Sequence, residues 1–93
     1  GETIQCLEME DHYVRVHDAV GSALILMRLT DAIDALGEEA GLRVHRSWWV
    51  ARDAVTGVVR EGRGLRLQLA NGRQVPVSQS YRQDVIATFG APA

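Results

Sequence analysis

Much of the chain alternates apolar and polar residues with a period of two, the pattern of half-buried β-strands. In residues 13–17, valines alternate with Tyr13, Arg15 and His17, directly after a polar turn. Residues 23–29 follow as the expected hairpin partner. The sequence therefore predicts an antiparallel hairpin in the first third of the chain, with these three side chains on its more polar face.

A second alternating segment covers residues 65–69, where leucines alternate with polar residues. Asn71-Gly72 then joins it to another apolar pair, Val75 and Val77. Asn-Gly is a preferred dipeptide of the type I′ turn, whose twist matches that of paired strands. We expect a hairpin here, closed by a type I′ turn.

One segment shows helical spacing instead. Apolar residues recur every three to four positions in residues 29–40, and Thr30-Asp31 supplies an N-cap followed by an acid in the first turn. We expect this helix to end at Gly41. Glu38-Glu39, near that end, opposes the helix dipole.

A further helix is expected after Ser78, where Tyr81, Val85 and Phe89 recur at helical spacing. These elements predict a fold that is mostly β with two short helices. A chain of 93 residues holds one core, so we expect one domain over residues 1–93, with its core at about residues 4–89. The lone cysteine, Cys6, is expected to be a buried hydrophobe on the first strand.

The charge of the chain is unevenly distributed. Residues 1–41 hold nine acids against two arginines, whereas residues 42–93 hold eight arginines against three acids. Lysine is absent, so every fixed cation is a guanidinium, whose planar fork suits phosphate and guanine edges. A GC-rich genome would favour arginine codons as well. A basic face for an anionic partner is nevertheless available in the C-terminal half.

The most informative motif is His45-Arg46-Ser47, which precedes the apolar run Trp48-Trp49-Val50. An imidazole, a guanidinium and a hydroxyl at the start of a strand can meet phosphate oxygens and a base edge together. Because His45 points inward where Arg46 points outward, His45 also fits a hydrogen-bonded structural imidazole. Only one of the two tryptophans can face the core of an alternating strand.

Three blocks of the chain, in this order, resemble the LytTR-type DNA-binding domain of bacterial transcription regulators. The blocks are Leu7-Glu8-Met9-Glu10-Asp11-His12-Tyr13-Val14, then Val44-His45-Arg46-Ser47-Trp48-Trp49-Val50, then the segment from Leu67 to Ser78. The resemblance runs from about residue 4 to residue 89. It implies small antiparallel sheets arranged side by side, in which loops rather than a recognition helix enter successive major grooves of DNA.

Carried over to this chain, the family's DNA-facing loops fall at three places. The DNA-binding residues that the resemblance implies are His12, Tyr13, His45, Arg46, Ser47, Ser78, Gln79 and Ser80. On geometry alone, Arg82 is added as a phosphate contact. Tyr13 fits a packing role equally well.

The chemistry of these residues divides into reading and positioning. Arg46 can donate two parallel hydrogen bonds to a guanine, a contact worth about 1 to 3 kcal/mol of discrimination. Ser47 and the backbone N–H groups near Ser78 suit phosphate. The chain departs from the family's pattern at two positions. Gln79 stands where arginine is common; the glutamine favours adenine and carries no charge. Ala51 stands where asparagine is common.

Enzymatic functions fit the spacing poorly. His12 and His17 lie on what reads as one strand, five positions apart, so they face opposite sides. The chain has no cysteine pair and no His-Glu-x-x-His motif for a metal. Ser47 near His45 lacks an orienting third group. We expect no enzyme, no metal site and no cofactor.

The expected partner is double-stranded DNA, bound at repeated half-sites by a dimer or by paired protomers. Family members usually join this domain to a receiver domain or to membrane helices, so the resemblance implies a piece of a longer regulator, in the cytoplasm or tethered to the inner membrane face. The alternative is a protein-interaction or sensory β module that uses the acidic N-terminal half. Salt dependence separates the two, because DNA binding weakens steeply as salt rises.

Overall fold

The computed structural model describes residues 3–92, which form eight strands and two α-helices together with two 3-10 turns. The strands are β1 (Ile4–Glu10), β2 (Tyr13–Asp18), β3 (Ser22–Leu26), β4 (Gly41–His45), β5 (Trp48–Ala51), β6 (Val55–Glu61), β7 (Gly64–Leu69) and β8 (Gln74–Val77). The helices are α1 (Leu29–Leu36) and α2 (Arg82–Phe89), and the 3-10 turns are η1 (Arg52–Ala54) and η2 (Gln79–Tyr81). The prediction of a mostly β fold with two short helices is confirmed.

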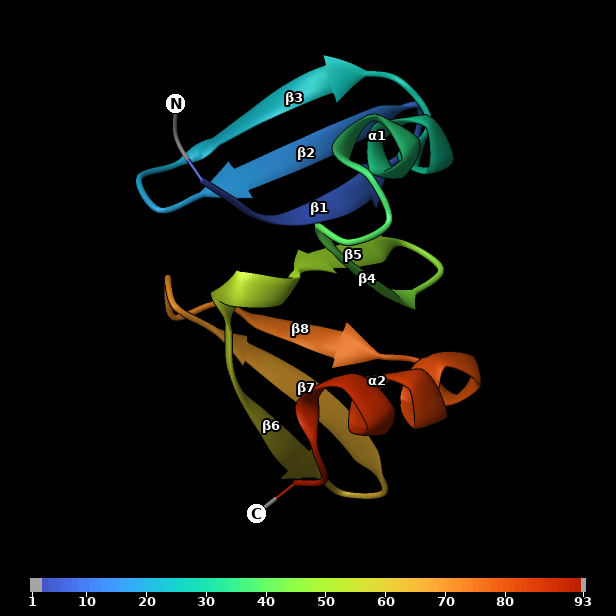
Figure 1. The fold of residues 1–93 in the computed structure, drawn as a ribbon. Coiled ribbons are helices and arrows are strands. Elements are labelled where there is room, and N and C mark those ends of the chain that lie inside the picture. The colour runs from blue at the N-terminus through green and yellow to red at the C-terminus, as the bar shows by residue number, and fades with distance from the viewer. Residues whose placement is uncertain (1–2, 93) are drawn as a thin grey trace.

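The strands form two antiparallel sheets, as the resemblance implied. The first has the order β3-β2-β1-β5-β4 and the second the order β6-β7-β8. Figure 1 shows the two sheets following one another along the molecule, with α1 beside the first and α2 beside the second. Two hydrogen bonds connect them: Ser78 N donates to Val44 O at 3.0 Å, and Asn71 N donates to Gln5 Oε1 at 3.0 Å.

Both predicted hairpins are present. In the first, β2 pairs with β3, and Val14 lies opposite Ile25. In the second, β7 pairs with β8, and the buried side chains of Leu67 and Val75 lie opposite each other. The expected partner strand at residues 23–29 ends earlier than predicted, because β3 stops at Leu26 and Leu29 is already the first residue of α1.

The predicted type I′ turn between β7 and β8 is wrong. That turn needs a positive φ at both central residues. Gly72 has a φ of 87°, but Asp11 is the one residue other than glycine with a positive φ within residues 3–92. The Asn71 side chain instead accepts a hydrogen bond from Arg73 N at 2.9 Å, and Leu69 N donates to Arg73 O at 2.9 Å. The result is a longer loop stabilised by an Asx-type contact.

Helix α1 differs from its prediction at both ends. It begins one residue before the expected Thr30 cap, and its N-cap residue, Arg28, makes no side-chain capping bond. It stops before Gly37, which turns the chain with a φ of 91°, and does not continue to Gly41. Glu38-Glu39 therefore lies outside the helix and does not oppose its dipole.

Helix α2 is the helix expected after Ser78, but its first residue is Arg82, because η2 forms one tighter turn first. Val85 is its fully buried anchor. The Arg82 side chain thus projects from the start of α2.

His17 corrects the prediction of a polar face on β2. The side chain is 3% exposed, although it belongs to the set that alternates with the valines. Its ring stacks on that of Trp48 with centroids 6.1 Å apart and an interplanar angle of 14°. Its Nε2 lies 3.3 Å from Glu8 Oε1. Part of the second face of this sheet is therefore buried as well, where Trp48 of β5 in the same sheet stacks on His17.

The two tryptophans divide as predicted. Trp49 is 2% exposed and belongs to the core, whereas Trp48 is half-buried over His17. The backbone of Gly41 passes so close to Trp49 that a Cβ there would lie 2.4 Å from its ring and 2.0 Å from Val50 O. Glycine is therefore needed where β4 begins beside β5.

Candidate nucleic-acid interface

Three connections lie on one side of the molecule, on the right in Figure 1. They are the β1–β2 turn at residues 11–12, the β4–β5 turn at residues 46–47, and the link between β8 and α2 at residues 78–81. These are the three places that the resemblance marked in the sequence. The fold brings all three together along one side, although about 65 residues separate the first from the last.

The β1–β2 turn presents His12 and Tyr13. Asp11 makes the turn with a φ of 54°, a conformation that aspartate tolerates better than most residues. His12 is exposed, and Tyr13 is 44% exposed. Because Tyr13 is partly exposed, its position is compatible with both roles predicted for it, packing and contact with DNA.

The β4–β5 turn is held in one conformation by its neighbours. Arg43 donates hydrogen bonds to the carbonyl oxygens of His45 and Arg46. His45 Nδ1 accepts from Ser47 N at 3.1 Å, and Ser47 O accepts from Met9 N at 2.8 Å. The half-buried His45 ring is thus hydrogen-bonded, as a structural imidazole would be, while the Arg46 side chain is exposed.

Arg43 is the residue that sequence reasoning missed here. Its position two residues before His45 was visible, but nothing in the strand pattern indicated that its guanidinium would turn back along the loop. It is half-buried and makes both of its bonds to backbone carbonyls. It shapes the turn that presents Arg46.

The third connection carries Ser78, Gln79 and Ser80. Ser78 accepts a hydrogen bond through its carbonyl from Tyr81 N at 3.0 Å, but its side chain makes no capping bond. The Ser78 hydroxyl is buried and has no hydrogen-bond partner within the described residues. Gln79 and Ser80 are exposed. Ser78 is thus the residue that precedes a helical start.

Arg82 lies beside this connection but is already partly engaged. Its Nη1 donates to Arg63 O at 2.7 Å, and the side chain is half-buried. A guanidinium has five N–H donors, so one bond leaves others for a phosphate. The structure therefore fixes the position of Arg82 and leaves its predicted contact open.

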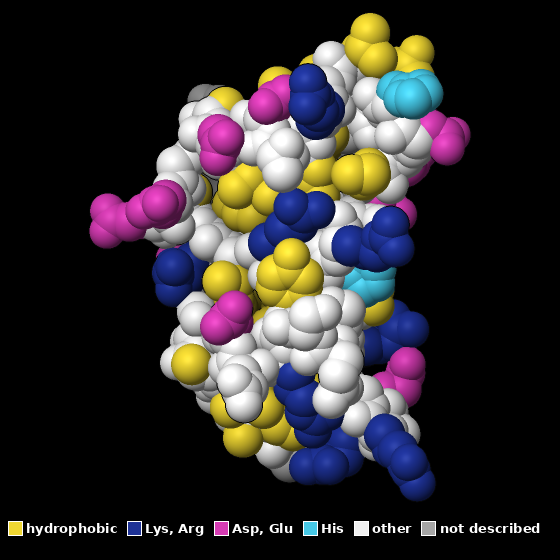
Figure 2. Space-filling view, turned by 90° about the vertical axis from the view of Figure 1, so that its right-hand side faces the viewer, with side chains coloured by type: hydrophobic (Ala, Val, Ile, Leu, Met, Phe, Trp, Pro, Cys, Tyr) yellow, Lys and Arg dark blue, Asp and Glu magenta, His cyan; other side chains and the backbone are white. Residues whose placement is uncertain are grey.

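The side of the molecule that bears the three connections carries arginine side chains. Figure 2 shows this side, where dark blue cationic groups occupy the middle and the lower part and acidic groups lie mostly at the margins. Not every arginine is free. Arg15 is held by Glu10 at 2.6 Å and by Ser22 at 3.0 Å, and the same contact keeps the pKa of the Glu10 carboxyl below its ordinary value. Cationic and acidic side chains are therefore unevenly distributed on this face of the molecule (Figure 2).

Two observations concern the cysteine and the potential metal ligands of residues 3–92. Burial raises the pKa of the Cys6 thiol to about 12, so its reactive thiolate is suppressed. Within residues 3–92, no three side chains of histidine, cysteine, aspartate or glutamate come together in a way that could hold a metal ion. Neither of the α-helices in these residues is long and apolar enough to cross a membrane.

The fold and the row of connections define a class, a small two-sheet β module with three loops along one side. A family model described as the LytTr DNA-binding domain matches residues 2–90. The chain belongs to the LytTR family of DNA-binding domains.

Known structures agree on the fold. The chain is similar to the LytTr DNA-binding domain of a Bacillus cereus protein described as a putative methyl-accepting/DNA response regulator, with a TM-score of 0.83 and 24% sequence identity. The similarity covers 96% of this chain and 83% of the other. No curated protein sequence matches.

Proposed function

We propose that this domain binds double-stranded DNA in a sequence-specific manner as the output module of a bacterial transcription regulator. The observation that carries the proposal is the alignment of three loops on one arginine-bearing side of a LytTR fold (Figures 1 and 2). Loops in such a row can follow a duplex, because the phosphates along its groove attract guanidinium groups at each step.

The loops divide the work between reading and positioning. Arg46 is exposed at the tip of a turn whose backbone Arg43 fixes, so it reads a guanine through two hydrogen bonds. Gln79, also exposed, suits an adenine. Ser47, the backbone near Ser80 and the free donors of Arg82 meet phosphates and set the register. His12 and Tyr13 contact the duplex at the other end of the row.

The size of the domain fits successive major grooves. Its longest dimension is 35 Å, close to the roughly 34 to 36 Å that separate equivalent points of the major groove on one face of B-DNA. One domain therefore spans about one helical turn, and two protomers, as a dimer or as paired copies, cover repeated half-sites. A role on DNA places the domain in the bacterial cytoplasm, with a receiver or other signalling segment elsewhere in a longer regulator.

Selection of bound duplexes from a random library tests the proposal, with wild type and Arg46→Ala run in parallel at low and at moderate salt. Wild type is expected to enrich a short repeated motif. Arg46→Ala should lose about 1 to 3 kcal/mol of discrimination at one base position and keep its melting temperature. Affinity should fall steeply with salt, with a log–log slope of about −0.9 for each phosphate contact.

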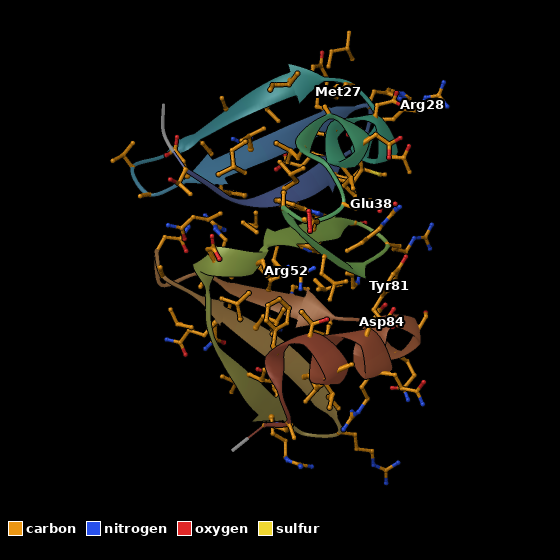
Figure 3. The ribbon with its side chains drawn as sticks, in the orientation of Figure 1. Met27, Arg28, Glu38, Arg52, Tyr81 and Asp84 are labelled. Atoms are coloured by element: carbon orange, nitrogen blue, oxygen red, sulfur yellow. The ribbon has the colours of Figure 1, made fainter. Side chains whose placement is uncertain are left out.

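Arg52→Ala is the matched control, since Arg52 is an exposed arginine at the opposite end of β5 from the β4–β5 turn (Figure 3). It removes the same charge but should leave the motif unchanged. Enrichment of nothing at either salt concentration would refute DNA recognition. An equal loss of discrimination in both variants would show that net charge, and not Arg46, governs binding.

A further inference from the structure

A surface hollow adjoins the row of loops and is unexplained by the contacts assigned above. It measures about 340 Å³ and lies between the β1–β2 turn and the link from β3 to α1. His12, a residue of the proposed DNA surface, forms part of its wall. Figure 3 places Met27 and Arg28, which also line it, toward the same side as Tyr81 of the third loop. The hollow is therefore continuous with the proposed DNA surface.

The walls of this hollow are mainly apolar and partly exposed. Met9 is 38% exposed and Leu26 is 70% exposed, and both line it. Leu26 lies directly opposite Tyr13 in the β2–β3 pairing. The polar residues that line it are Asp11 and His12 on the β1–β2 turn and Arg28 and Thr30 on the chain from β3 into α1, and Arg28 Nε lies 3.9 Å from Asp31 Oδ2. An apolar hollow that shares His12 with the proposed DNA surface suits a small apolar group of the duplex.

Duplex DNA offers one such group in its major groove. Among the four base edges displayed there, thymine alone carries an apolar group, the C5-methyl, and it is flanked by backbone phosphates. We propose that this hollow receives thymine methyl groups, so that Leu26 and Met9 select A·T pairs at the end of the binding site that His12 contacts. The inference rests on the proposed DNA binding and adds the kind of base read at that end.

A second copy of the chain is the competing occupant. Strand β3 is an edge strand, and all five of its residues are exposed. Pairing of two β3 strands would cover Leu24 as well as Leu26, whereas the hollow involves Leu26 and not Leu24. Leu24 is 48% exposed on the same strand, so it provides a matched control that separates the two occupants.

The test replaces thymine by uracil, one position at a time, in the selected duplex, which removes the methyl group and keeps every hydrogen-bonding edge. Wild type should lose about fourfold in affinity at one or more thymines of one end, the loss expected when one methyl-sized group is no longer buried. Leu26→Ala should bind the thymine and uracil duplexes equally at those positions. Leu24→Ala should discriminate as wild type does, and circular dichroism should show all three proteins folded.

The remaining outcomes overturn the inference. If wild type binds the duplex but no thymine differs from uracil, or if Leu26→Ala keeps the difference, the hollow does not read methyl groups, although DNA binding itself stands. If both leucine variants lose affinity equally and also lose concentration-dependent self-association in sedimentation, β3 is an interface between copies. If wild type binds no duplex, the proposed function fails and this inference fails with it.

Discussion

The three-stranded and five-stranded sheets bury different kinds of residue. In the smaller sheet, the buried side chains of β7 and β8 are all aliphatic, with Leu65, Leu67, Leu69 and Val75 at 4% exposure or less. In the larger sheet, apolar residues share the interior with polar ones. The buried polar side chains of residues 3–92 are Gln5 and His17, which belong to β1 and β2.

The difference follows from how many faces are covered. Strand β7 has one covered face, and its alternate residues Arg66 and Gln68 reach solvent to different degrees. The central strands of the larger sheet bury residues on both faces. Leu7 and Val16 pair on the face that packs against α1. Cys6 and His17 pair on the other face, where the Trp48 ring stacks on His17.

A strand with one covered face shows its burial in its sequence, whereas a strand with two covered faces does not. A period-two pattern reports which residues lie on the same face. It does not report whether a second layer covers the other face. The polar residues of such a face then need partners, because burial without a hydrogen bond costs free energy. Gln5 and His17 have such partners in Asn71 and Glu8.

Leu67→Ala is expected to have the largest effect on stability. Leu67 is fully buried in the middle of the apolar sheet, so its truncation should lower the free energy of unfolding by about 2 to 5 kcal/mol. Leu24→Ala, in the exposed edge strand, should change it by less than about 0.5 kcal/mol. Urea unfolding measures both. Similar losses in the two variants would show that β3 is covered in solution.

The same reasoning explains which elements could be predicted from the sequence. The β7–β8 hairpin was predictable because its leucines alternate and one face is open. The burial of His17 was not, because it depends on Trp48, which comes from a strand thirty-one residues later. The prediction placed the end of α1 too far along the chain, because Ala40 continued the apolar spacing. The helix ends before Gly37, whose positive φ turns the chain. The prediction of a type I′ turn at Asn71-Gly72 was wrong because the Asn71 side chain accepts a hydrogen bond from Arg73 N.

The candidate site was predictable in a different way. Periodicity placed strands and turns but gave no reason for three distant turns to lie on one side, which the resemblance to LytTR domains supplied. The role of Arg43 was not accessible to either argument. Its contacts to two carbonyl oxygens depend on the backbone path of the β4–β5 turn, which no local pattern of residue types specifies.

Gln5→Ala tests the polar side of the comparison. The Gln5 amide oxygen accepts from Asn71 N at 3.0 Å and so connects β1 to the β7–β8 loop. Its loss should lower the free energy of unfolding by about 0.5 to 1.5 kcal/mol, the usual net value of one hydrogen bond. Gln68→Ala, on the exposed face of β7, is the control and should be nearly neutral. Equal effects would mean that this connection does not contribute to stability.

His17 adds a pH dependence that the aliphatic sheet lacks. Burial lowers the pKa of His17 from its ordinary value of 6.5, with Arg73 and Arg15 acting in the same direction and the Glu8 contact opposing them. The folded state therefore binds fewer protons than the unfolded state, so the stability from neutral His17 is present above the ordinary value and is lost as the pH falls below it.

His17→Phe keeps a ring on Trp48 but cannot titrate. Between about pH 7.5 and about pH 5.5, wild type should lose more stability than this variant in urea unfolding. His12→Gln, in an exposed turn, should keep the wild-type dependence. If His17→Phe follows the wild-type curve, the acid sensitivity has another source, and the buried imidazole does not set the difference between the sheets.

The smallest effect is expected on the open face of β7, where Arg66 pairs with Glu61 at 2.7 Å. The two side chains are 34% and 61% exposed, so water screens the pair. Arg66→Ala should lower the free energy of unfolding by less than about 1 kcal/mol, and the loss should shrink at high salt. Arg60→Ala, which removes an exposed arginine from the neighbouring strand β6, controls for net charge. A loss that is large and independent of salt would show that this face is covered too. The contrast between a sheet with one covered face and a sheet with two would then no longer explain where the polar residues are buried.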